Sequence, residues 1–345
     1  MQHAVARRKF GKFKNGDPRA VRQQKATKDP MMERLLKSCE RFAETLESNK
    51  ERIDRIQFEL DRKEGHEIAS SWFLECIGNL EYSAEDIEKL SLSPPDGKLL
   101  EDGVFGAFFD MLLFHGKDNE YTVHCLDWSP YELGDSNSKK IVVHGECSDV
   151  GSGMFAGEIT VSGRAEGLGS YMEGGVINAI SCREAGRKMK DGLIKVSGDV
   201  HTAGGEMAGG KIEIGGNCEY LGRKMEGGLI VVKKDVRFAS KILGGKIHVH
   251  GNLETVFDIE GGTLVVDGNA DSVGNTMKGG EIIVKGNCCM VGQGMSGGKV
   301  TVHGNVNGIW PLMRGGEVHV HGDLEFMGLI DAGKVYHKGK LIVDK

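Results

Sequence analysis

Several features that commonly reveal a protein's function are missing from this sequence. Its eight cysteines include no Cys-x-x-Cys pair, which excludes the usual spacings of zinc ribbons, iron–sulfur clusters and thioredoxin-like sites. The longest apolar run, Val104 to Phe114, is shorter than the roughly 20 residues that cross a membrane, and it contains Asp110. The N-terminus is basic and polar and lacks the apolar segment of a secretory signal. We therefore expect a cytoplasmic protein without membrane contact.

Proline is also scarce, with 6 residues, whereas glycine is abundant, with 52 in a chain of 345. The glycines follow no period of three, so a collagen-like structure is excluded. No catalytic constellation accompanies them. Gly292 to Gly297 match the dinucleotide-binding pattern G-x-G-x-x-G, but these glycines are repeat corners and not the strand-to-helix turn that the motif needs. The composition predicts a folded chain with turns at regular intervals, with no cofactor and no catalytic activity of its own.

Charge is distributed unevenly along the chain. Residues 1–30 contain nine basic and two acidic residues, so they carry a charge of +7, while the formal net charge of the chain is -6. Their low apolar content and the turn-like Asn15 to Pro18 predict a flexible arm. Such an arm is suited to contact nucleic acid or an acidic protein, and a solubilising tail is the alternative. The candidate polyanion-binding residues are Arg7, Arg8, Lys9, Lys12, Lys14, Arg19 and Arg22.

Residues 31–97 are predicted to be mainly helical. From Met32 onward, apolar residues alternate at spacings of three and four, as in the seam of a coiled coil, and Asn49 lies where a polar residue fixes register. We expect this seam either to join two chains or to pack against the amphipathic segment from His66 to Leu80. The candidate oligomerisation residues are Leu35, Phe42, Leu46, Asn49, Ile53, Ile56 and Leu60.

From about residue 139 to the C-terminus, a unit of 17 or 18 residues repeats about twelve times. Each unit begins after a glycine, alternates polar residues with Ile or Val over five positions, and turns at a second glycine, as in Gly262 to Gly268. Period two indicates a short strand with one buried face, and a fixed period indicates a solenoid. Because crossovers between parallel strands prefer one hand, we predict an all-β, right-handed parallel β-helix over residues 139–345.

Residues 98–138 are assigned to the cap of this β-helix. The end of a cylindrical repeat domain exposes its core and needs a cover. The apolar stretch from Val104 to Phe114 fits either a helix or a buried strand, whereas Tyr121 to Trp128 alternates like a strand. We expect this segment to pack before the first coil.

Two apolar columns and a few histidines stand out within the repeat. One column is mostly methionine, from Met154 to Met313, and its recurrence at an inward position favours core packing over soft-metal binding. His303 and His321 occupy the same position in adjacent coils, with His319 nearby. Stacked imidazoles on an outward face are weak candidates for metal ligands, and a solvated strand face is the more common arrangement.

The unit Gly-Gly-x-Ile-x-Val-x-Gly-Asn, clearest from Gly262 to Gly315, resembles the GXGXG-repeat domain. That domain occurs in the C-terminal part of the glutamate synthase large subunit and in one of the subunits of formylmethanofuran dehydrogenase. The resemblance covers about residues 139–345 and implies a right-handed parallel β-helix with an architectural role in large oxidoreductase complexes. Gln2 stands where a glutaminase would have its N-terminal cysteine nucleophile.

Three hypotheses for the function follow. The first is a non-catalytic scaffold that assembles protein partners, including further copies of itself, through its rigid β-helix, helical segment and basic arm. The second, implied by the resemblance, is an accessory subunit of a glutamate synthase-like or formylmethanofuran dehydrogenase-like complex. The third is a nucleic-acid- or ribosome-associated factor that uses the arm of residues 1–30.

Overall fold

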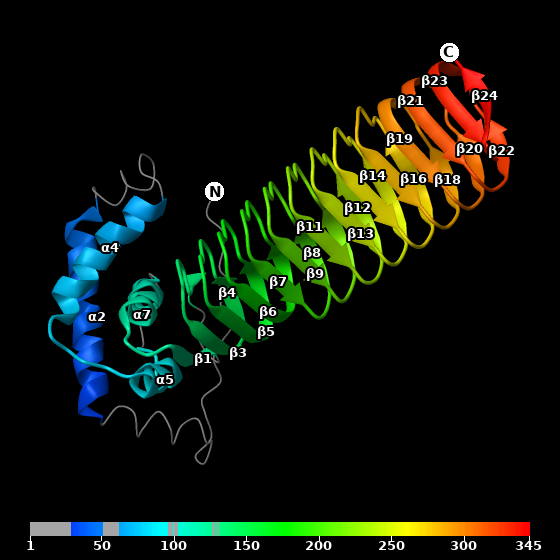
Figure 1. Cartoon of the computed structure of the whole chain (residues 1–345). Coiled ribbons are helices and arrows are strands. Elements are labelled where there is room, and N and C mark those ends of the chain that lie inside the picture. The colour runs from blue at the N-terminus through cyan, green and yellow to red at the C-terminus, as the bar shows by residue number, and fades with distance from the viewer. Residues whose placement is uncertain are drawn as a thin grey trace.

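The computed structural model describes residues 29–50, 62–95, 99, 103–125, 128, 130 and 132–345. A region with four described helices precedes a parallel β-solenoid of about 12 turns, which runs from residue 120 to 337 (Figure 1). The predicted combination of a helical N-terminal region and a parallel β-helix is therefore confirmed. No helix within the described ranges has the length and apolar character needed to cross a membrane.

Two of the described helices begin at residues whose side chains cap them. Asp29 accepts a hydrogen bond from the Met31 backbone N–H at 2.9 Å, directly before a proline in the first turn. Ser83 and Asp86 form a capping box, with aspartate in place of the usual glutamate or glutamine. The described helices are α2 (Pro30–Ser48), α4 (Arg62–Ile77), α5 (Ala84–Leu92) and α7 (Val104–His115).

The predicted seam of α2 packs inside the same chain. Leu35 and Phe42 are fully buried, and the Phe42 ring lies 6.4 Å from Phe73 of α4 and 5.9 Å from Phe108 of α7. Leu46 is partly buried against the same core, and Asn49 ends the helix, where its side-chain amide donates to the Thr45 carbonyl at 2.8 Å. At these positions the seam therefore packs within its own chain, which is the second of the two predicted arrangements. Three predicted oligomerisation residues lie outside the described residues, namely Ile53, Ile56 and Leu60.

Helix α7 covers the N-terminal end of the solenoid, as the cap assignment predicts (Figure 1). Phe105 and Phe109 pack on Trp128 with ring centroids 4.8 and 5.1 Å apart. The buried Asp110 carboxylate accepts the Gly134 backbone N–H at 2.6 Å, which fixes the helix to the first coil. The ambiguous apolar stretch is therefore a helix, and its one acidic residue is a docking contact.

The solenoid begins earlier than residue 139. Strand β1 (Glu120–Cys125) pairs in parallel with β3 (Lys140–Gly145) over six positions, so it belongs to the first coil and not to the cap. The repeat pattern does not reveal this coil because it lacks the glycine pair on which the other units align. The solenoid boundary therefore moves to residue 120.

Each coil contributes strands to two parallel ladders. The long strands β5 (Glu158–Leu168) and β6 (Val176–Ala185) run through both ladders. The first ladder continues from β3 with β7 (Leu193–Val196), β9 (Lys211–Ile214), β11 (Leu229–Val232), β13 (Lys246–Val249), β15 (Thr263–Val266), β17 (Glu281–Val284), β19 (Ser296–Val302), β21 (Met313–Val320) and β23 (Ile330–His337). The second ladder contains β2 (Glu132–Leu133), β4 (Cys147–Val150), β8 (Val200–Ala203), β10 (Cys218–Leu221), β12 (Val236–Ser240), β14 (Leu253–Phe257), β16 (Ala270–Asn275), β18 (Cys288–Val291), β20 (Val306–Ile309) and β22 (Leu324–Met327).

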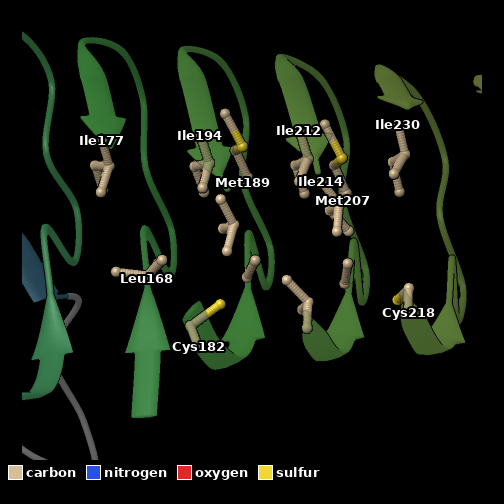
Figure 2. Close-up of a cluster of buried hydrophobic side chains, with 14 of the residues drawn as sticks. Leu168, Ile177, Cys182, Met189, Ile194, Met207, Ile212, Ile214, Cys218 and Ile230 are labelled. Carbon is tan, nitrogen blue, oxygen red and sulfur yellow. The ribbon is translucent and has the colours of Figure 1, made fainter. Parts of the chain in front are cut away.

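The third side of each coil is a hydrogen-bonded turn that carries the methionine column. The Glu226 N–H donates to the carbonyl of Met207 in the preceding coil at 2.8 Å, and Ala208 donates to Met189 at the same distance. Every methionine of the column from Met154 to Met313 is fully buried, which confirms the core interpretation. Figure 2 shows Met189 and Met207 pointing into the interior beside Ile194 and Ile212.

The glycines that define the repeat have left-handed backbone conformations. All eleven, from Gly157 to Gly333, have φ between 75° and 114°, a region that side chains disfavour. Space is limiting too: a Cβ on Gly228 would lie 2.6 Å from Met207 Cε and 2.8 Å from the Gly210 carbonyl oxygen. The methyl end of each methionine thus packs on the glycine of the next coil.

The turns after the first-ladder strands from β7 to β21 are stabilised by stacked Asx side chains. Each side-chain oxygen accepts the backbone N–H of its counterpart one coil later, as from Asn287 to Asn269 at 2.8 Å. The series satisfies backbone donors that a strand would otherwise leave open at a corner. It comprises Asp199, Asn217, Asp235, Asn252, Asn269, Asn287, Asn305 and Asp323.

Candidate functional site

The three predicted metal-binding histidines lie on the outer face of the first ladder. The rings of His303 and His321 stack with centroids 4.8 Å apart, as predicted from their shared repeat position. His319 instead stacks on Tyr336 at 4.3 Å, and its Nε2 lies 3.2 Å from Glu317 Oε2. Within the described ranges, these three imidazoles do not meet as one group of ligands.

The structure gathers a different set of metal-ligating side chains, which we call the His-Asp cluster: His248, His250 and Asp267. Ile247 and Val249 of β13 face the core, so the two histidines between and after them face outward on the same side. Asp267 follows β15 in the next coil. Its Oδ2 lies 2.9 Å from His248 Nε2 and 2.7 Å from His250 Nδ1.

Two lysines extend this cluster along the same outer column. Lys285 Nζ lies 2.8 Å from Asp267 Oδ1, and Lys233 Nζ lies 3.2 Å from His250 Nε2. Desolvation would raise the pKa of Asp267, but hydrogen bonds from Lys285, His248 and His250 outweigh it and hold that pKa well below its usual range. Asp267 is therefore an ionised carboxylate shared by three potential donors.

The sequence contains a pattern that predicts this cluster, but the pattern is visible only when residues of different types are compared in register. His250 and Asp267 both stand five residues after their turn glycines, Gly245 and Gly262, and are therefore neighbours in consecutive coils. Comparing only histidines in register selected His303 and His321. A search for unlike ligands in register, starting from the His-x-His pair of β13, would have found Asp267.

The cysteines are a poor basis for a shared site. Seven are buried, and burial raises the pKa values of Cys218 and Cys288 to about 12. Cys289 alone is exposed, as its position beside the inward Cys288 predicts, and its Sγ lies 3.9 Å from Asp271 Oδ1.

A shallow groove of about 970 Å³ follows the Asx series where each coil enters the second ladder. Its outer wall is a column of side chains with mostly alternating charge. Arg237 bridges Glu219 and Glu254 in the coils on either side, at 3.2 and 3.3 Å, and His201 lies 2.8 Å from Glu219. Arg164 and Arg237 offset only part of the charge of the five lining carboxylates, so the groove has an acidic excess.

Large exposed apolar side chains concentrate at the C-terminal end. This surface, the apolar end, holds seven of the thirteen large hydrophobic residues exposed in the described part of the chain. The first ladder is closed there by β24 (Lys340–Asp344), which pairs antiparallel with β23, whereas β22 ends the second ladder (Figure 1). The seven residues are Trp310, Leu312, Phe326, Met327, Leu329, Leu341 and Ile342.

The predicted polyanion-binding residues lie outside the described residues, so that assignment stays a prediction. They are Arg7, Arg8, Lys9, Lys12, Lys14, Arg19 and Arg22. A comparison with known protein-family models finds no match, and a search of curated proteins also finds none.

Proposed function

We propose that this chain is a non-catalytic scaffold protein whose solenoid is a rigid rod that presents an end surface to a protein partner. The observation that carries the proposal is the apolar end. Leu329 is 70% exposed and Phe326 is 58% exposed, whereas the other six large exposed apolar residues are spread along the described chain between residues 74 and 243. Clustered exposed apolar residues mark surfaces that bind other proteins.

Within the described residues, the sides of the rod lack such an apolar cluster, which supports a structural role for the sides and a binding role for the end. Along the outer columns, charges are paired between consecutive coils, as in Arg237 with its two glutamates. The Asx series satisfies the backbone at one corner, and parallel strands continue without interruption between the ends. A rod of this kind holds its two ends at a fixed separation, which is the mechanical property that a scaffold requires.

The residue type at one repeat corner also favours a binding role for the apolar end. Leu312 has φ of 76°, a conformation that is costly for a bulky residue, and its side chain is 49% exposed. Its N–H donates to the Leu329 carbonyl at 3.3 Å, so the two exposed leucines belong to adjacent turns. The same corner is left-handed in the preceding coils, where it carries polar residues such as Lys241, Asp258 and Thr276, so an exposed leucine there is the feature that distinguishes the apolar end.

A second candidate is an accessory subunit of an oxidoreductase complex. It is favoured by the repeat unit itself, which resembles the GXGXG-repeat domain of such complexes. A third is a nucleic-acid- or ribosome-associated factor, favoured by the charge of residues 1–30. The partner recovered at the apolar end distinguishes the first two, because a metalloenzyme subunit there supports the accessory role.

Site-specific photo-cross-linking in the native cell tests the scaffold proposal. A benzoylphenylalanine replaces Phe326 in one variant and Phe155, which is 51% exposed, in a matched control. We expect one identified protein, or a second copy of this chain, to cross-link at position 326 and not at 155. Leu329→Asp should abolish that cross-link while leaving the melting temperature unchanged. Equal cross-linking at both positions would contradict the proposal.

A further inference from the structure

We propose that the His-Asp cluster of His248, His250 and Asp267 is a binding site for a borderline divalent transition-metal ion, of the class of Zn²⁺, Ni²⁺ or Cu²⁺. The two imidazole nitrogens and the carboxylate oxygen all lie within 4.8 Å of one another. Imidazole nitrogen with one carboxylate suits these ions, whereas Ca²⁺ and Mg²⁺ prefer oxygen ligands alone.

The backbone fixes the positions of all three ligands. Strands β13 and β15 pair in continuous parallel register, from Lys246 with Thr263 to Val249 with Val266. The Asp267 N–H continues that ladder by donating to the Val249 carbonyl at 2.8 Å. Because the ligands lie on or directly after paired strands, little conformational entropy is lost when an ion binds.

Only small side-chain movements are needed to admit the ion. The present nitrogen–oxygen separations of 2.7 and 2.9 Å are hydrogen-bond distances. Tetrahedral ligands that bind zinc at 2.0–2.1 Å lie about 3.3 Å apart, so each pair must separate by roughly half an ångström. The side chains are 34%, 35% and 25% exposed for His248, His250 and Asp267, which leaves room for this rotation and a position for water.

The flanking lysines are compatible with the site, although each has a different effect. Lys285 holds Asp267 Oδ1 and thus leaves Oδ2 directed at the histidines. The Lys233 contact to His250 Nε2 places the imidazole proton on Nδ1, facing Asp267. Metal at Nδ1 moves that proton to Nε2 and displaces the flexible Lys233 side chain into solvent. The affinity should therefore be lower than that of a closed structural zinc site.

A second His-Val-His sequence in this chain provides an internal comparison for the proposed site. His319-Val320-His321, at the end of β21, repeats the His-Val-His arrangement at the end of β13, and the Lys338 N–H donates to the Val320 carbonyl as Asp267 does to Val249. Lys338 therefore stands where the His-Asp cluster has its carboxylate, and it pairs with Asp323 at 2.7 Å. The β21 histidines share the motif but lack the third ligand at that position.

Isothermal titration of the full chain with ZnCl₂ and NiCl₂ tests the proposal. We expect one binding equivalent for the unmodified chain, its loss in His248→Gln/His250→Gln, and at least tenfold weaker binding in Asp267→Asn. The matched control His319→Gln/His321→Gln should bind as the unmodified chain does. Circular dichroism and melting temperature establish that each variant is folded.

A second measurement uses only the unmodified chain and thus does not depend on the folding of variants. Diethylpyrocarbonate modifies accessible imidazoles, and mass spectrometry locates the products. Zn²⁺ should slow modification of His248 and His250 at least tenfold and leave His303 and His321 unaffected. The proposal is overturned by the absence of saturable binding, by unchanged binding in the His248/His250 double variant, or by equal protection of both histidine groups. None of these results bears on cross-linking at Phe326.

Discussion

Replacing Gly228 by alanine should destabilise the rod strongly because the left-handed backbone and the interior packing oppose it together. Gly228 has φ of 85°, and holding a non-glycine residue in that region costs roughly 1–2 kcal/mol. The added methyl would also lie 2.6 Å from Met207 Cε, 2.8 Å from the Gly210 carbonyl oxygen and 2.9 Å from Gly209 C. The methionine can rotate, but the two backbone atoms belong to the adjacent coil and cannot move independently.

Overpacking a close-packed site typically costs a further 1–3 kcal/mol, so we expect a loss of about 2–5 kcal/mol in the free energy of unfolding. Gly205→Ala is the matched control, because nothing lies within 4 Å of its added Cβ and Gly205 is not left-handed. That control should change stability by less than about 0.5 kcal/mol. The same methyl group is added in both variants, so a difference between them reports backbone conformation and local space.

The assay combines urea unfolding with hydrogen exchange resolved by peptide. In a solenoid, neighbouring coils carry the coupling, so Gly228→Ala should accelerate exchange most in β9, β11 and β13 and less toward the ends. If the free energies of unfolding of Gly228→Ala and Gly205→Ala lie within about 0.5 kcal/mol of each other, the packing of methionine on glycine does not hold the coils together.

Further outcomes follow from other contacts. Asp110→Ala should cost about 2–3 kcal/mol and raise exchange in α7, because the Gly134 and Asp135 N–H groups lose their acceptor; unchanged exchange in α7 would contradict its docking role. The pKa of Asp267 is lowered in the folded state, so the ionised carboxylate stabilises the fold fully above about pH 5. This stabilisation is lost as the pH falls through and below about 3.9, the usual pKa of an aspartate in an unfolded chain. Asp267→Asn should therefore flatten the fall in melting temperature below about pH 5. Cys289 should be the one cysteine that reacts rapidly with a thiol reagent under native conditions, and Cys289→Ser should remove that fast phase; rapid labelling of Cys288 would refute its burial. Deleting residues 1–28 should abolish retention on heparin if the basic arm binds polyanions, and unchanged retention would reject that role.

The helical segment illustrates a choice that periodicity leaves open. Apolar residues such as Leu35 and Phe42 recur at coiled-coil spacing, and that spacing specifies a buried face without naming its partner. The partner at these positions belongs to the same chain, because Phe73 and Phe108 fill the space beside Phe42. A helix that packs within its own chain and a helix that packs against a second chain show the same apolar spacing.

The histidines show the same limit on the solenoid surface. The repeat period correctly placed His303 over His321, since both follow their turn glycines by five residues. It also placed His250 over Asp267, but only side-chain directions and distances reveal that His248 reaches the same carboxylate. Outward residues are not constrained by the core, so their contacts depend on rotamers and neighbours.

The sequence by itself determined the rod: its period, its corner glycines and its interior methionine column all follow from one repeated pattern, because each coil must bury the same face against the next. Tertiary structure alone decided where the rod begins, how α7 docks through Asp110, and that Leu312 and Leu329 meet at an exposed apolar end. These features arise at the ends of the repeat. There the neighbouring coil is absent or replaced, and local pattern no longer specifies what covers the core.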